Sequence, residues 1–235
     1  IMAQIFNYFP LLIFKSEIKL SEEEKNKMIK EIILMEKESK NLDFKGSTSS
    51  WTGDTQGYEF IHNNVVFENF FKEVNKSLIE YLETLSIDSN QLNIYYQRSW
   101  ATISRGKENI NSHKHLQSHL SFAYYLKKKD SDAKIIFYDT NFANEFLPGI
   151  INSLSAEKKK IIKKRTPINS GMVLFDAKEN DIVIFPSKTV HGTQINTPND
   201  ERISISADIT ITAKESSGLE HLTTPLEKWK LVKLK

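Results

Sequence analysis

The sequence contains no cysteine, and it has only 8 glycines and 6 prolines among its 235 residues. The lack of cysteine excludes thiolate catalysis, cysteine-ligated zinc, iron–sulfur clusters and disulfides. The chain also has no large excess of charge of either sign, because it contains 32 Lys and Arg residues and 30 Asp and Glu residues, a difference of +2. A chain so close to neutral is not a general polyanion binder, so we expect no nucleic-acid partner.

Long hydrophobic runs are absent as well. No run approaches the roughly 18–20 apolar residues of a membrane span, and the opening IMAQIFNYFPLLIF lacks the basic region and cleavage site of a signal peptide. We therefore expect no membrane partner and a cytoplasmic location. A hydrophobic content of 39% with 26% charged residues excludes disorder along most of the chain. The length suits one integrated domain.

Residues 1–90 are expected to form a helical support segment. Ser21 and Glu24 have the spacing of a capping box ahead of apolar residues at helical intervals. A second helix is indicated by one continuous apolar stripe from Phe67 to Leu85. Residues 41–59, rich in Ser, Thr, Gly and Asp, are expected to be a loop.

Residues 91–235 are expected to form a β-core on which the helical segment packs. Short β-rich runs separated by turn signals, with few helices between them, predict an antiparallel sandwich or barrel. The expected strands are residues 91–104, 120–126, 134–138, 172–175, 181–185 and 202–212.

An insertion at about residues 139–170 interrupts this core. It is long for a plain connection, which is typical of a lid or a partner surface, and it carries an expected helix at 155–165. Either its basic side chains form a solvated helix face, or they contact an acidic substrate or nucleic acid. These side chains are Lys158, Lys159, Lys160, Lys163, Lys164 and Arg165.

Six histidines are present: His62, His113, His115, His119, His191 and His221. Because side chains alternate along a strand, His113 and His115 in an H-x-H pattern point to the same face. With His191 from a distant strand they could bind a divalent metal on one side and leave positions open for substrate. Spacing alone does not choose between iron, zinc, copper and nickel.

Arg202 and Ser204 share one face of the last predicted strand. A guanidinium and a hydroxyl directed into a barrel would make a pocket for a carboxylate. The alternative is an arginine at the start of a strand that faces solvent or pairs with Glu201. Taken with the histidines, we favour the pocket.

The chain resembles the 2-oxoglutarate- and Fe(II)-dependent oxygenases, and more narrowly their prolyl-hydroxylase-like group found in phages and marine bacteria. The opening Ile5-Phe6…Phe9-Pro10 also resembles that group, so the resemblance covers most of the chain. The matching pieces are Trp100, Gly106, His113-Lys114-His115, Ser121, Tyr124-Tyr125-Leu126, residues 180–187, His191 and residues 202–206.

The resemblance implies a double-stranded β-helix (jelly-roll, cupin-like) core with supporting helices, a mainly β fold of the α+β class. It implies Fe(II), 2-oxoglutarate and O2 as cofactors, with His113, His115 and His191 as the metal ligands. The superfamily usually has a carboxylate in place of His115. A water-completed site of two histidines, a carboxylate from Asp139 or Asp208, and an inactive site therefore remain open.

By the same resemblance, Arg202, Ser204 and Tyr125 would bind the distal carboxylate of 2-oxoglutarate. Trp100, Gln97, His119 and Ser121 would lie near the substrate or behind the metal ligands, although ordinary core packing is an alternative for Trp100. The implied activity is hydroxylation of a C–H bond, coupled to decarboxylation of 2-oxoglutarate. No cysteine or protein nucleophile is needed for it.

Two other functions remain open on the sequence. A cupin-like binding or structural module would keep the barrel without turnover, and a zinc hydrolase would use the three histidines with a metal-bound water. A peptidyl proline, an amino acid, a nucleobase or another small molecule could be the substrate. The N-terminal helices either brace the barrel or form a homodimer contact.

Overall fold

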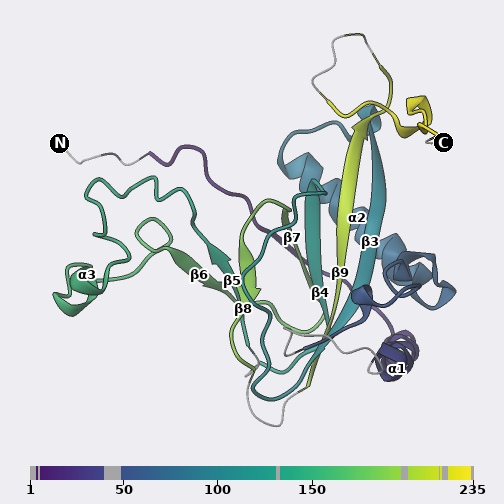
Figure 1. Ribbon diagram of the computed structural model, residues 1–235, viewed down its shortest axis with the longest axis horizontal. Coiled ribbons are helices and arrows are strands. Elements are labelled where there is room, and N and C mark those ends of the chain that lie inside the picture. The colour runs from purple at the N-terminus through teal and green to yellow at the C-terminus, as the bar shows by residue number, and fades with distance from the viewer. Residues whose placement is uncertain are drawn as a thin grey trace.

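The computed structural model describes residue 4 and residues 6–39, 49–130, 133–196, 201–216, 218 and 222–233. His221 and Ile5 lie outside these residues. Three α-helices and nine strands are present in the described part (Figure 1): β1 (Phe14–Glu17), α1 (Glu22–Ser39), β2 (Ser50–Trp51), α2 (Glu68–Thr84), β3 (Leu92–Ser104), β4 (Leu120–Lys127), β5 (Ile135–Tyr138), α3 (Leu154–Lys158), β6 (Met172–Phe175), β7 (Asp181–Pro186), β8 (His191–Thr193) and β9 (Arg202–Ala213). None of the helices in these ranges has the length and apolarity that crossing a bilayer requires.

The strands form two antiparallel sheets. The major sheet has the order β1-β7-β4-β9-β3-β2, and the minor sheet has the order β6-β5-β8. In Figure 1 the minor sheet lies to one side of the major sheet, and α1 lies beyond the opposite side. This is the double-stranded β-helix architecture that the sequence predicted, mainly β with supporting helices.

A short segment before β4 extends the minor sheet. His113 and His191 form an antiparallel bridge, in which each backbone N–H donates to the other residue's carbonyl oxygen at 2.9 Å. Gly192 permits this close approach, because a Cβ at residue 192 would lie 2.9 Å from the carbonyl oxygen of Ile110. The chain before β4 is thereby held directly beside β8.

The helices cover the outer face of the major sheet. α1 begins with the predicted capping box: the Glu24 amide donates to the Ser21 hydroxyl at 3.2 Å, and the Ser21 amide donates to the Glu24 carboxylate at 2.8 Å. α2 buries the predicted apolar stripe. Its Phe70 ring lies 4.7 Å from the ring of Tyr124 on β4. The main hydrophobic core is therefore the layer between the helices and this sheet.

Strict alternation of side chains separates that core from the interior of the barrel. On β9, Ile203 and Ile205 belong to the helix-facing core, whereas Arg202 and Ser204 line a cavity on the inner face. The same period of two divides β4 and β7. A smaller apolar cluster fills the space between the two sheets next to the cavity, and it consists of Tyr125, Ile135, Phe137, Ala177, Val183 and Phe185.

Three expectations need correction. The helix expected at 155–165 is only α3, since Lys160 adopts a positive φ of 53° and the lysine run that follows offers little apolar surface to bury. The loop expected at 41–59 contains β2 in its described part. Residues 1–90 are not only helical, because they supply both edge strands of the major sheet, β1 and β2. The 139–170 insertion projects away from the sheets (Figure 1).

Candidate metal centre

Three histidines from two distant stretches of the chain meet at the inner face of the barrel. One ring nitrogen of each of His113, His115 and His191 lies within 4.8 Å of those of the others. Backbone pairing positions the rings: His113 and His191 are bridged across the minor sheet, and the His115 amide donates to the Ser187 carbonyl oxygen at 2.9 Å. The predicted meeting of His113, His115 and His191 is thus present in the structure.

Each of these imidazoles is anchored through Nδ1 to an oxygen that can only accept a hydrogen bond. The bonds run from His113 to the Asn111 carbonyl at 2.8 Å, from His191 to the Thr189 carbonyl at 2.9 Å, and from His115 to the carboxylate of Asp208. The proton therefore resides on Nδ1 and leaves the Nε2 lone pair of each ring as donor to a cation. Ligating histidines in metalloproteins are oriented in this way, so the residues fit a divalent metal.

The electrostatics keep two of these rings neutral. Burial, reinforced by the neighbouring His113, lowers the pKa of His191 to about 3. Burial also lowers the pKa of His113, against a smaller opposing contribution from its hydrogen bond to Asn111. Because a metal binds neutral imidazole, these rings are ready to coordinate near neutral pH without first losing a proton.

Asp208 lies behind the histidines on β9 and is fully buried. Besides His115, its carboxylate accepts hydrogen bonds from the Ser118 hydroxyl at 3.1 Å, the Ser121 hydroxyl at 3.2 Å and the Gln117 amide at 3.0 Å. Burial raises the pKa of Asp208, but the hydrogen bond and charge of His115 and the two hydroxyl donors together bring it below its usual value. The buried carboxylate is therefore ionised.

The structure does not bring the two alternative carboxylates into the ligand cluster. Asp208 bonds to His115 from behind, and Asp139 accepts the backbone amides of Asn141 and Phe142 in an exposed turn. Within the described residues, the group of facing ligand atoms consists of the three histidines alone.

A cationic end of the same cavity is formed by Arg202, Ser204 and Tyr125. Arg202 is 1% exposed; it donates to the Ala133 carbonyl at 3.1 Å and to the Ser104 hydroxyl at 3.2 Å. Tyr125 stands opposite Ser204 in the β4–β9 register. Burial raises the pKa of Tyr125, although the charge of Arg202 acts in the opposite direction, so the phenol keeps its proton and can donate a hydrogen bond.

An aromatic wall closes the cavity beside the histidines. The Trp100 ring stacks on His115 with centroids 5.8 Å apart, and Trp51 meets His113 edge-on, also at 5.8 Å. Trp100 is buried, and its Nε1–H finds no acceptor among the described residues. The sequence predicts Trp100 here but not Trp51, which lies in the stretch expected to be a loop.

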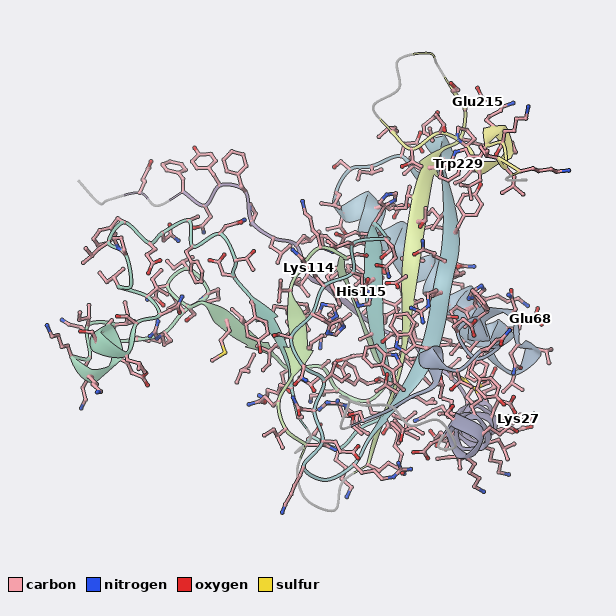
Figure 2. All side chains as sticks on the ribbon, viewed as in Figure 1. Lys27, Glu68, Lys114, His115, Glu215 and Trp229 are labelled. Atoms are coloured by element: carbon pink, nitrogen blue, oxygen red, sulfur yellow. The ribbon has the colours of Figure 1, made fainter. Side chains whose placement is uncertain are left out.

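Two other predicted residues lie outside the cavity lining, and one lies within it. Gln97 donates to the Gln117 carbonyl at 3.2 Å. His119 is exposed, and its Nδ1 accepts the Ile211 amide at 2.9 Å, so it faces away from the metal centre. Ser121 lines the cavity and donates to Asp208. Figure 2 labels His115, which lies between the two sheets, with Lys114 close to it.

Residues 98–208 match the family model described as "Putative 2OG-Fe(II) oxygenase". The match runs from β3 to β9 and includes all three histidines and Arg202. Over this region, which is slightly less than half of the chain, the β-core is therefore similar to the 2OG-Fe(II) oxygenases. The description of that family gives Fe(II) and 2-oxoglutarate as its cofactors, and O2 is implied by the oxygenase class. The sequence matches no curated protein at a significant level.

Solved structures share the fold at low sequence identity. The nogalamycin-biosynthesis carbocyclase SnoK has a TM-score of 0.54 and 11% identity, and the match covers 92% of this chain and 89% of SnoK. HygX from Streptomyces hygroscopicus, with nickel, 2-oxoglutarate and hygromycin B bound, has a TM-score of 0.53 and 11% identity over 85% of this chain and 83% of HygX. The epimerase SnoN has a TM-score of 0.53 and 12% identity over 89% of this chain and 84% of SnoN.

Proposed function

We propose that the protein is a hydroxylase that uses 2-oxoglutarate and O2, with Fe(II) held by the Nε2 atoms of His113, His115 and His191. One observation carries the proposal: three anchored imidazoles face one point in a cavity that also contains Arg202. A module that only kept the barrel would need neither a metal-binding face nor a buried guanidinium beside it.

In this proposal Arg202, Ser204 and Tyr125 bind the distal carboxylate of 2-oxoglutarate. The guanidinium supplies charge and paired N–H donors, while the hydroxyl and phenol add neutral donors from the neighbouring strands. Together they orient the cosubstrate so that its other end points toward the histidines. The small side chains of Ser121, Ala123 and Ser206 on the inner sheet face leave room for it.

When bound, Fe(II) with 2-oxoglutarate and O2 supplies the oxidation in which a substrate C–H becomes C–OH and 2-oxoglutarate becomes succinate and CO2. The protein contributes position and exclusion of water. Trp51, Trp100 and Phe185 shield the centre with apolar surface, and the Nε1–H of Trp100 offers a donor to whatever occupies the cavity.

The substrate is proposed to be a small molecule, an amino acid or a peptidyl proline. HygX is described with hygromycin B bound, which supports a small molecule. SnoK and SnoN are described as a carbocyclase and an epimerase. Because related folds serve such different reactions, hydroxylation rests on the chemistry of the class and needs its own test.

The test is anaerobic addition of Fe(II) and 2-oxoglutarate to the purified protein, followed by exposure to O2. We expect a visible metal-to-ligand charge-transfer band, and then O2-dependent formation of succinate. His191→Ala should abolish the band, whereas His119→Ala, which changes a histidine facing away from the cavity, should retain it. No band in the wild-type protein contradicts the proposal; a band without succinate would instead indicate a binding module.

A further inference from the structure

The proposed iron site contains no negatively charged ligand among the described residues, because its ligand atoms come from three histidines. Neutral ligands leave the full charge of a divalent cation in a buried, low-dielectric cavity, which is unfavourable without a compensating anion. A nearby fixed negative charge would therefore strengthen metal binding.

Asp208 carries such a charge and directs it at one ligand. It is 0% exposed and His115 is 9% exposed, so solvent screens their interaction little. The other hydrogen bonds to its carboxylate come from neutral groups of Gln117, Ser118 and Ser121. Within the described residues, no Lys or Arg forms an ion pair with Asp208.

The surrounding hydroxyls hold this carboxylate in place. Ser118 and Ser121 both reach Oδ1 of Asp208, the atom that accepts the His115 hydrogen bond, and both also contact the Ser187 hydroxyl at 2.9 Å. With His115 and Gln117, four neighbouring donors fix the orientation of the carboxylate.

We propose that Asp208, acting through His115, supplies the metal with the negative charge that a directly bound carboxylate would otherwise provide. A carboxylate on the distal N–H of a ligating imidazole raises the basicity of the ligand and fixes its orientation. Asp208 is in this sense a positioning and charge-supplying residue, and the inference rests on the proposed iron site. This role explains how a site whose third ligand is a histidine, in place of the usual carboxylate, can still bind Fe(II).

The experiment compares Asp208→Asn with Ser118→Ala. The first removes the charge and keeps an acceptor for His115; the second removes a hydroxyl from the same carboxylate and keeps its charge. Titration of the metal-free proteins with Co(II) should show an affinity about 10- to 100-fold weaker for Asp208→Asn and a much smaller loss for Ser118→Ala. Equal affinities for Asp208→Asn and wild type, or equal losses in the two variants, would overturn the inference.

A second readout separates charge from geometry. Removing a negative charge destabilises Fe(III) more than Fe(II), so the midpoint potential of bound iron should rise in Asp208→Asn and stay near the wild-type value in Ser118→Ala. A potential that does not rise in Asp208→Asn would mean that Asp208 only holds the structure together.

A third measurement needs no variant, so it decides the question even if Asp208→Asn fails to fold. In the Zn(II)-loaded wild-type protein, nuclear magnetic resonance compares the Nδ1–H groups of the three ligands. His115 should show the stronger hydrogen bond, because His113 and His191 donate to neutral carbonyls. Three indistinguishable Nδ1–H groups would refute the proposal that Asp208 supplies negative charge through His115.

These outcomes are distinguishable from failure of the proposed function. If the wild-type protein binds metal but forms no succinate, hydroxylation fails while the role of Asp208 can still hold. If succinate forms and Asp208→Asn behaves as wild type, only the inference fails. If the wild-type protein binds no metal, both are refuted.

Discussion

The two faces of the major sheet are built from alternate residues of the same strands, yet they have opposite characters. On β9, Ile203 and Ile205 are completely buried against the helices. On the other face, Arg202 and Ser204 line the cavity and Asp208 bonds to His115. One face supplies apolar burial and the other supplies polar groups that are costly to bury. Stability and chemistry should therefore respond separately to substitutions one residue apart.

The largest expected effect lies on the outer face. Ile205→Ala removes buried methyl groups and leaves a cavity between β9 and the helices, which should lower the free energy of unfolding by about 2–5 kcal/mol. Denaturant titration measures the change. The matched substitution on the inner face is Ser206→Ala, whose side chain borders the cavity and should cost much less. Similar losses in the two variants would contradict the separation of the faces.

The next effect belongs to the inner face. Arg202→Ala removes charged hydrogen-bond donors from the proposed carboxylate pocket, so 2-oxoglutarate affinity should fall by about 10- to 100-fold. Calorimetric titration of the metal-loaded protein measures it. Arg105→Ala is the control, because Arg105 pairs with Glu36 and Glu201 and is not among the residues that line the cavity. Equal affinities for wild type and Arg202→Ala would refute the assignment.

The minor sheet completes the inner face by holding His113 beside His191. Substitution of Gly192 tests whether this pairing positions the two rings. A Cβ at residue 192 would meet the Ile110 carbonyl oxygen at 2.9 Å and the Ser112 amide at 3.2 Å, both of them backbone atoms. Gly192→Ala should cost about 1–3 kcal/mol of stability and weaken Co(II) binding, since it pushes the His113 segment away from His191. Unchanged metal affinity would show that the bridge does not position the rings.

Much of this two-faced arrangement could be predicted from periodicity. The spacing of two in residues 202–206 and in the H-x-H pattern is local, so it correctly indicated the shared faces of Arg202 with Ser204 and of His113 with His115. The predicted strands also agree closely with the bounds of β3, β4, β6, β7 and β9. Regular elements that bury one face are strongly encoded in hydrophobic pattern.

Features that depend on distant partners could not be predicted in this way. β2 and β8 are too short to show a period, and each is a strand only because a neighbour lies beside it. Trp51 reaches the histidines because β2 pairs with β3, which composition does not reveal. Asp208 was an alternative direct ligand because sequence identifies a carboxylate but not the His115 imidazole to which it is hydrogen-bonded.

The smallest expected effect belongs to an ion pair that links α1 to the loop before β7. Breaking this pair should leave the inner face of the sheet unchanged. Glu179 pairs with the buried Lys25 of α1 at 2.5 Å and accepts the Lys128 amide at 3.0 Å. Burial raises the pKa of Glu179, but the Lys25 hydrogen bond, the Lys128 amide and the Lys25 charge together bring it below the ordinary value of 4.5.

Because the folded-state pKa is depressed, the unfolded state binds more protons in acid, and this stabilisation is present above pH 4.5 and lost as pH falls through the lower folded value. Glu179→Gln should thus cost about 1 kcal/mol or less at neutral pH, since the carboxylate is partly exposed and Lys25 retains Glu22 at 3.2 Å. Denaturant titrations across acidic pH should show the wild type and the variant converging. A difference that grows in acid would contradict the ion pair, and a change in Co(II) affinity would show that the two faces are not independent.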